Sequence, residues 1–259
     1  TGATVYVTGR TAVEGTAPLP GTVFETAAEI TKLGGIGVPA VCDHADDAQV
    51  KALFDRVAAE SGHVDILVNN AAVIPEGLID HGPFWKRPLG LIDMIEVGAR
   101  SSFVSSWYAA PLLVKSAGGL VVNTSSFGGG CYMHGPAYGA AKAAVDKMAH
   151  DMAIDFEPYG VCAVSIWMAL LKTERTQQLF DANPDTWGLR ANSAETPQFI
   201  GRVIDGLARD PKRMERSGKV WIAAELGREY GLKNADRSEP LSQRATLGGP
   251  WDFNPAIIA

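Results

Sequence analysis

The stretch Leu120–Lys142, LVVNTSSFGGGCYMHGPAYGAAK, joins a short apolar run to a helical pattern through a glycine-rich turn. The apolar run Leu120–Val122 leads into the small polar residues Asn123–Ser126, a pattern typical of a buried strand that reaches its carboxyl end. From Tyr138 onward, apolar residues recur at three- and four-residue spacing, which predicts a helix. Ligands of open α/β sheets bind outside the carboxyl ends of the strands. The stretch therefore predicts a strand–turn–helix unit with a binding site at its rim.

Tyr138 and Lys142 are four residues apart, so they share one face of the predicted helix. An ammonium group held near a phenol lowers the pKa of the phenol, and Ser125 is placed to hydrogen-bond a carbonyl oxygen that gains or loses the proton. This arrangement is suited to acid–base chemistry on alcohols and ketones. Alone, the spacing fits an exposed pair beside a serine-rich turn equally well.

Composition and charge limit the class of protein. The chain has 259 residues, 46% of them hydrophobic and 20% charged, which fits one α/β domain over residues 1–259. A net charge of -6 argues against a nucleic-acid partner. Three scattered cysteines and dispersed histidines favour neither a disulfide framework nor a metal site, and they suit a reducing cytoplasm. Apolar runs all fall short of the ~18 residues of a membrane span.

Short apolar strands alternate with helical segments along the chain. The predicted strands are Thr4–Thr8, Gly37–Cys42, Asp65–Asn69, Gly119–Thr124, Val161–Trp167 and Lys219–Ala223. The predicted helices are Asp47–Ser61, Leu91–Ser116, Pro136–Glu157 and Thr196–Arg209. Two loops are expected, Thr11–Gly21 and Thr173–Asn192, the second with Phe180 and Trp187 as an apolar substrate lid. The alternation predicts a doubly wound parallel sheet in a single domain.

Several of these motifs occur in the order and spacing of the short-chain dehydrogenase/reductase family. The chain carries Val68–Ala72, similar to the Asn-Asn-Ala-Gly strand end of that family, a serine thirteen residues before Tyr138, the Tyr138/Lys142 pair, and Thr173 after the sixth strand. Other segments resemble the dehydrogenase/reductase member 1 branch, namely Phe84-Trp85, Val97–Arg100, Ser217–Val220 and Tyr230–Leu232. The resemblance covers nearly the whole chain and implies a Rossmann-like fold.

The resemblance implies a hydride transfer between a nicotinamide cofactor and a carbonyl or alcohol carbon. Tyr138 would donate the proton in reduction, Lys142 would hold the nicotinamide ribose and lower the tyrosine pKa, and Ser125 would position the substrate oxygen. A homodimer or homotetramer through the long fourth and fifth helices is also implied.

Four further residues match cofactor-binding positions of the family. Asp43 would meet the adenine ring, Asn70 and Ala71 would line the adenosine side of the groove, and Thr173 would meet the carboxamide. From the sequence alone, Asp43 also fits an ordinary turn residue.

The chain departs from the family pattern at three places. Gly98 stands where the family usually has an asparagine that completes a proton relay, and Met168-Ala169 replaces the usual Pro-Gly. The glycine-rich phosphate loop is not found: Gly34–Gly37 precedes a strand, and Gly128–Gly130 is better suited to a close substrate approach than to phosphate. The native polypeptide is therefore expected to extend about 35 residues upstream, through a first strand, that loop and a helix.

Arg10 follows the second family strand, where an acidic residue would bind the ribose hydroxyls of NAD and an arginine would accommodate the 2′-phosphate of NADP. NADP(H) is therefore favoured over NAD. The sequence predicts a cytoplasmic NADP(H)-dependent oxidoreductase acting on a small carbonyl or alcohol substrate. The alternatives are a non-catalytic nucleotide-binding or scaffold protein of the same fold, which Gly98 and the unmatched phosphate loop favour, and a carbon–carbon double-bond reductase.

Overall fold

The structure, a computed structural model, describes residues 2–185, 187, 191 and 194–258. Two compact units divide the chain, Thr1–Ser61 and Gly62–Ala259. All strand pairs are parallel, and each unit has a sheet of its own, β1-β2 in the first and β3-β4-β5-β6 in the second. The predicted Rossmann-like α/β fold with parallel strands is confirmed. The assignment of residues 1–259 to a single domain stays a prediction.

The N-terminal unit contains β1 (Thr4–Gly9), α1 (Val23–Lys32), β2 (Ile36–Val41) and α2 (Asp47–Glu60). A Cβ atom at Gly37 would lie 1.9 Å from the Ala27 carbonyl oxygen, so α1 can approach β2 this closely only over a glycine. The predictions did not include α1. It buries Val23 and Ala27, which lie four residues apart on one face of the helix.

The larger unit is built on the four strands β3 (Ile66–Asn69), β4 (Leu120–Ser126), β5 (Cys162–Met168) and β6 (Val220–Ile222). β4 is buried along its whole length and β5 along nearly all of it. The outer strand β3 leaves Ile66 and Val68 about two-fifths exposed, at 42% and 40%. Apolar exposure of this kind is unusual for a parallel strand, which normally has both faces covered. The expected upstream strand stays a prediction.

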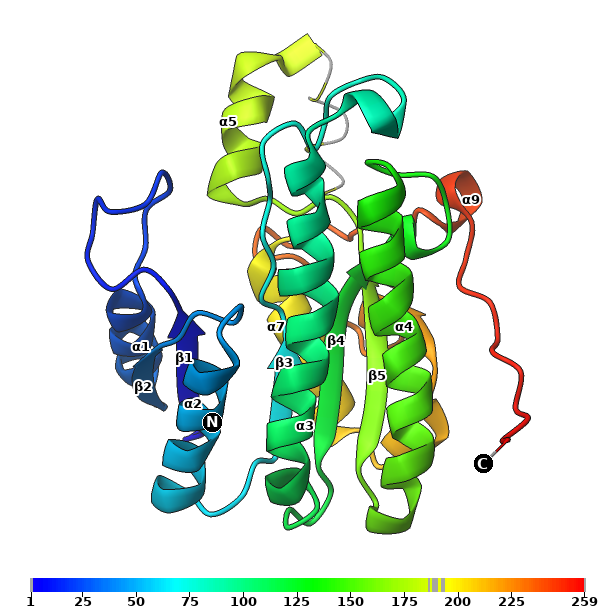
Figure 1. Ribbon diagram of the computed structural model, residues 1–259. Coiled ribbons are helices and arrows are strands. Elements are labelled where there is room, and N and C mark those ends of the chain that lie inside the picture. The colour runs from blue at the N-terminus through cyan, green and yellow to red at the C-terminus, as the bar shows by residue number, and fades with distance from the viewer. Residues whose placement is uncertain (1, 186, 188–190, 192–193, 259) are drawn as a thin grey trace. The chain divides into compact units, whose positions relative to one another are not determined.

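Helices cover both faces of this sheet (Figure 1). α3 (Ser101–Leu113) and α4 (Pro136–Phe156) lie on one face, and α7 (Pro197–Arg209) lies on the other. The main core is apolar contact between β4, β5, α7 and α8 (Ala223–Glu229), with Leu120, Val122, Val164, Ile166, Phe199, Val203 and Leu207 among its buried residues. Sheet residues therefore alternate between the α4 face and the α7 face along each strand.

The remaining elements are short: η1 (Phe84–Lys86), η2 (Leu89–Ile92), η3 (Met94–Arg100), η4 (Phe127–Gly129), η5 (Glu157–Tyr159), α5 (Glu174–Ala182), η6 (Arg213–Arg216) and α9 (Arg244–Leu247). The predicted helix Leu91–Ser116 changes its helix type along its length, because η3 is π-helical and leads directly into α3. Gly98 lies in this turn, and its carbonyl accepts a hydrogen bond from the Ser102 hydroxyl at 2.7 Å. Such back-bonding bends helices.

The prediction of a loop over Thr173–Asn192 is wrong for its first half. Thr173 and Thr176 form a capping box that starts α5, and Phe180 is buried on that helix. The Phe180 and Trp187 rings lie 6.3 Å apart. Within the proposed lid, residues 186, 188–190 and 192 lie outside the described residues, so the lid stays a prediction.

Three consecutive glycines, Gly128–Gly130, allow the turn after β4 to lie against three large side chains. A Cβ atom on the first glycine would lie 2.3 Å from the Tyr138 ring, and one on the second would lie 2.5 Å from the Asp146 carboxylate. On the third it would lie 2.7 Å from the Trp167 ring. The glycines, which the sequence assigned to substrate approach, therefore bring the turn onto α4 and β5.

Substitution of Gly128 by alanine should lower stability, because the Tyr138 ring would have to move away from the added methyl group. Overpacking of this kind costs about 1–3 kcal/mol, measurable as a change in the free energy of unfolding by urea denaturation. Gly201→Ala is the matched control, since nothing lies within 4 Å of a Cβ atom there and α7 gains a better helix former. Equal effects of the two substitutions would contradict this account of the turn.

Candidate active site

Tyr138 and Lys142 lie on successive turns of α4, as predicted. The helix begins at Pro136, a favoured first residue, after Gly135 with a φ of 94°. The Lys142 Nζ atom lies 5.9 Å from the centroid of the Tyr138 ring and donates a hydrogen bond to the Thr124 carbonyl at 3.2 Å. The two side chains thus meet at the carboxyl end of β4.

Ser126, the neighbour of the predicted serine, contacts the tyrosine hydroxyl. The Ser126 Oγ and Tyr138 hydroxyl oxygens share a hydrogen bond of 2.7 Å. Ser125 points the other way: it is fully buried, and its hydroxyl donates to the Lys142 backbone carbonyl at 3.4 Å and hydrogen-bonds the Asp146 side chain. The contact between Ser125 and the reacting oxygen stays a prediction, and in this structure Ser126 is the serine that lies beside the Tyr138 hydroxyl. Successive strand residues face opposite sides of a sheet, so a shift of one residue reverses the direction of the side chain.

Asp146 is a buried carboxylate that the sequence did not single out. It lies one helical turn beyond Lys142 and is 2% exposed. The Ser165 hydroxyl and the Trp167 indole N–H donate to it at 2.5 and 2.7 Å, from the adjacent strand β5. A Tyr-x-x-x-Lys-x-x-x-Asp spacing could have indicated it, since the three residues share one helix face.

Burial opposes the charged forms of both predicted catalytic side chains. It raises the pKa of Tyr138, although the hydrogen bond with Ser126 acts in the opposite direction. Burial also lowers the pKa of Lys142, and the negative charge of Asp146 opposes that shift. The lowering of the tyrosine pKa that the sequence predicts does not dominate here. Burial therefore favours the protonated phenol, which is the form that can donate a proton.

A second loop approaches Tyr138 from the rim. The His134 ring makes an edge contact with the Tyr138 ring at a centroid distance of 5.1 Å. His134 has a φ of 57°, and its carbonyl accepts a hydrogen bond from the Arg87 guanidinium at 2.9 Å. Arg87 also donates to the Gly77 carbonyl at 2.9 Å. This arginine therefore joins the segment before η1 to the turn that precedes α4.

The predicted cofactor residues Asn70, Ala71 and Thr173 belong to the same unit as Tyr138. The Thr124 hydroxyl donates to the Asn70 side chain at 3.2 Å, which places Asn70 beside the end of β4, and Ala71 follows it. The Thr173 hydroxyl accepts from the Thr176 amide as the N-cap of α5. Asn69, in contrast, is buried and donates to Ser106 and Asn123, so it caps the strand end.

The other two predicted cofactor residues, Arg10 and Asp43, belong to the N-terminal unit. Arg10 is exposed just after β1 and has no ion-pair partner among the described residues. The Asp43 carboxylate accepts a hydrogen bond from the Ala45 amide at 3.0 Å, and its own amide donates to the Gln49 side chain. Asp43 thus forms the turn that precedes α2.

Among the described residues, no three histidine, cysteine or acidic side chains gather as metal ligands would. In the same part of the chain, helices with the length and hydropathy needed to span a bilayer are not found.

Comparisons with known proteins identify the family of the chain. The family model for short chain dehydrogenases matches residues 2–184. Dehydrogenase/reductase SDR family member 1 of Mus musculus is 38% identical over 99% of this chain and 86% of its own length, and that of Homo sapiens is 37% identical over the same shares. A crystal structure of a putative dehydrogenase from Xanthomonas campestris matches with a TM-score of 0.75 and 23% identity, covering 93% of this chain and 88% of the other.

The match of the family model extends over more than half of the chain, and two relatives exceed 30% identity over nearly all of it. Oxidoreductase chemistry with a nicotinamide nucleotide is what this family implies. The chain therefore belongs to the short-chain dehydrogenase family, and within it to the branch of family member 1.

Proposed function

We propose that the protein is an NADP(H)-dependent oxidoreductase that interconverts a small carbonyl compound and its alcohol. The observation that carries the proposal is the 2.7 Å contact between the Ser126 and Tyr138 hydroxyl groups, with the Lys142 ammonium on the same face of α4. Two hydroxyl groups at this separation can both hydrogen-bond one carbonyl oxygen. The Ser126 hydroxyl would orient that oxygen, and the Tyr138 hydroxyl would donate the proton that it gains on reduction.

Lys142, Asn70, Ala71 and Thr173, which belong to one unit, offer groups suited to a nicotinamide dinucleotide. The cofactor, when bound, supplies or accepts the hydride. Lys142 has one backbone carbonyl as its hydrogen-bond partner at 3.2 Å, which leaves donors for ribose hydroxyls. Asn70, Ala71 and Thr173 would contact the adenosine side and the carboxamide, and Asp43 the adenine ring. The Arg10 guanidinium, which has no ion-pair partner in the described part of the chain, suits the 2′-phosphate of NADP.

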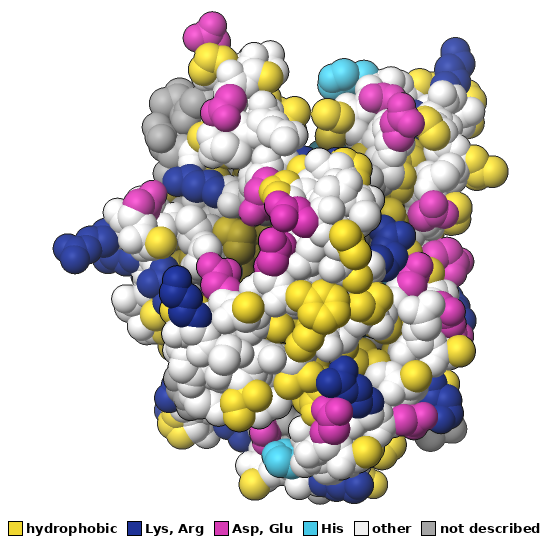
Figure 2. All heavy atoms as spheres, turned by 90° about the vertical axis from the view of Figure 1, so that its left-hand side faces the viewer, with side chains coloured by type: hydrophobic (Ala, Val, Ile, Leu, Met, Phe, Trp, Pro, Cys, Tyr) yellow, Lys and Arg dark blue, Asp and Glu magenta, His cyan; other side chains and the backbone are white. Residues whose placement is uncertain are grey.

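The partners and the location are part of the proposal. Both signs of charge are interspersed on the face shown in Figure 2, and no continuous basic surface is seen there, which favours a small-molecule substrate over nucleic acid. Phe103 and Trp107, one turn apart on α3, are 50% and 63% exposed, which supports a homodimer or homotetramer through the long helices. The three cysteines are free thiols, in keeping with a cytoplasmic protein.

Substitution of Tyr138 by phenylalanine tests the assignment of the acid. Removal of the proton donor should lower carbonyl reduction by about 10²-fold or more, whereas NADP(H) affinity should change little. Turnover is measured by NADPH consumption over a panel of ketones and aldehydes, and affinity by fluorescence titration. A phenylalanine variant that works at the wild-type rate would contradict the assignment. NADPH binding without turnover on any carbonyl or activated alkene would favour the scaffold alternative, and turnover on alkenes alone would favour a double-bond reductase.

Substitution of Arg10 by alanine tests the cofactor preference. Loss of the charged donors should weaken NADPH binding by roughly 1.5–3 kcal/mol, about 10- to 100-fold, with little effect on NADH. Arg209→Ala is the matched control, since Arg209 is an exposed arginine paired with Asp205 on α7. Titrations of both cofactors with the three proteins decide the matter. Equal losses of NADH and NADPH affinity would show that Arg10 does not recognise the phosphate.

A further inference from the structure

Glu195 is a buried acid between β5 and α7 that the proposed reaction does not use. Its residue exposure is 0%. The Oε2 atom accepts a hydrogen bond from the Ala169 amide at 3.1 Å, whereas Oε1 is buried and has no hydrogen-bond partner among the described residues. A buried charge without a counter-ion is strongly unfavourable. The geometry alone therefore favours a carboxyl group that keeps its proton.

The backbone of Glu195 holds the segment Ala169–Thr173, which leads from β5 to the N-cap of α5. Its amide donates to the Leu170 carbonyl and its carbonyl accepts from the Lys172 amide, both at 2.8 Å. Leu171 and Glu195 form a parallel bridge. With the side-chain bond to Ala169, three hydrogen bonds join one residue to this segment. Thr173, the predicted carboxamide contact, is its last residue.

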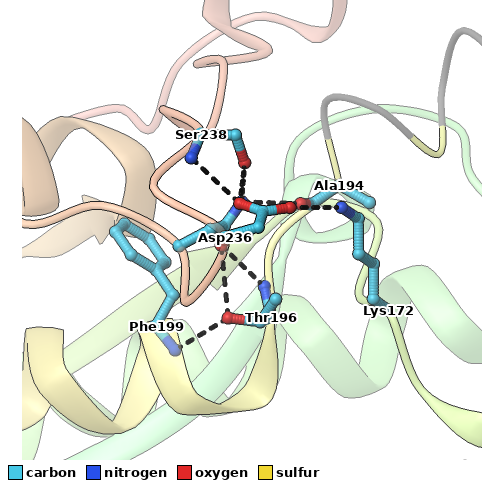
Figure 3. Close-up of polar contacts among 7 residues, drawn as sticks. Lys172, Ala194, Thr196, Phe199, Asp236 and Ser238 are labelled. Carbon is cyan, nitrogen blue, oxygen red and sulfur yellow. Dashed lines mark hydrogen bonds and ion pairs between the residues drawn. The ribbon is translucent and has the colours of Figure 1, made fainter.

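Neighbouring contacts fix Glu195 from the other side. Asn234 is 2% exposed and binds both flanking residues, accepting from the Thr196 amide at 3.0 Å and donating to the Ala194 carbonyl at 3.1 Å. Figure 3 shows the same loop reaching Lys172, whose Nζ atom pairs with Asp236 at 3.3 Å. The Glu195 side chain is thus attached to a backbone that is held on both sides.

The charged groups around Glu195 are already paired with others. On the flanking segments these are Lys172 with Asp236 and Lys233 with Glu239, and Arg202 on α7 donates to the Lys233 carbonyl. Hydrogen bonds from Ser238 lower the pKa of Asp236 to about 2. Burial raises the pKa of Glu195 to about 7, with the Ala169 amide acting in the opposite direction. Glu195 therefore titrates separately from these neighbours.

We propose that Glu195, as a neutral carboxylic acid, is a positioning residue that holds the segment Ala169–Thr173 in place for the nicotinamide cofactor. The cofactor part of this inference rests on the proposed function. The part that concerns the segment rests on the hydrogen bonds alone and can be tested without activity.

Amide hydrogen exchange, measured between pH 5 and 8, tests the role of the Glu195 proton. Amides of β4 serve as an internal reference, and each exchange rate is divided by the intrinsic rate of that amide at the same pH. In the open segment the carboxyl group of Glu195 has its ordinary pKa of 4.5, whereas in the closed segment its pKa is about 7. Protonation therefore stabilises the closed form, and this stabilisation is lost as the pH rises from 4.5 to 7. Protection of the Ala169 and Lys172 amides should be highest at low pH. It should fall by up to about tenfold per pH unit towards pH 7 and then level off.

Glu195→Gln should abolish this pH dependence, because the amide is neutral at every pH and its oxygen can still accept from Ala169. Glu195→Leu should reduce the protection at every pH, since the acceptor is lost. Glu225→Gln is the matched control: hydrogen bonds from Arg244 hold the pKa of Glu225 below its ordinary value. Its exchange profile should be that of the wild type. The same pH dependence in Glu195→Gln and the wild type would overturn the proposal.

Titration with NADP+ over the same pH range tests the link to the cofactor. As the pH rises towards 7, the NADP+ affinity of the wild type should decline relative to that of Glu195→Gln. The decline should occur over the same pH range as the loss of amide protection. An exchange difference without any difference in NADP+ affinity would overturn the positioning role. If no protein, the wild type included, bound NADP+, the proposed function would fail, and the exchange data would still decide whether Glu195 holds the segment.

Discussion

The site depends on how closely the turn after β4 approaches α4. Side chains on the turn would keep it away from α4. The three glycines have no side chains, so the turn can lie directly against Tyr138, Asp146 and Trp167. Once the turn lies against the helix, the hydroxyl groups of Ser126 and Tyr138 come within 2.7 Å of each other. Backbone proximity is therefore what brings the hydroxyl group of a strand residue to that of a helix residue.

The polar groups beneath the site belong to the same arrangement. Asp146 accepts from Ser165 and Trp167 of β5 and from Ser125 of β4, so it joins the two central strands to α4 under Lys142. A buried carboxylate is tolerated only where several donors satisfy it. Its charge also opposes the effect of burial on the pKa of Lys142, which helps to keep that ammonium protonated. Ser125 thus lies under the helix beside Lys142 and Asp146, whereas Ser126, although buried as well, contacts the Tyr138 hydroxyl.

Much of the fold could be predicted from the sequence, because six apolar runs and the period of α4 are local patterns. All six predicted strands are found within one or two residues of their expected bounds. The helix α1 was not predicted, although Val23, Ala27 and Ile30 recur at helical spacing and could have indicated it. The capping box at Thr173 could have indicated α5, but Thr173 was interpreted as a loop residue. The π-helical turn at Gly98 was not predicted, because the period of apolar residues does not distinguish it from an α-helix.

Within the site, Tyr138 and Lys142 followed from helical spacing, whereas the serine did not. The family spacing of thirteen residues selects Ser125, but the turn in this chain brings the serine twelve residues before Tyr138 to its hydroxyl. An alignment that is wrong by one residue selects a strand side chain on the opposite face of the sheet. Only three-dimensional contacts show which of the two serines faces the Tyr138 hydroxyl. Asp146 and Glu195 were missed for a related reason: their partners come from segments far away in the sequence.

The most direct test of the account compares Ser126→Ala with Ser125→Ala in carbonyl reduction, with the free energy of unfolding measured for both. The account predicts that Ser126→Ala lowers kcat/KM by about tenfold or more, with little loss of stability. The same substitution should have a smaller effect on kcat/KM in the Tyr138→Phe variant, because the two hydroxyl groups act together. Ser125→Ala should instead lower stability by about 1–3 kcal/mol, because Asp146 loses a donor, and should leave the rate per folded molecule near that of the wild type. A large loss of rate in Ser125→Ala, with Ser126→Ala fully active, would contradict the account.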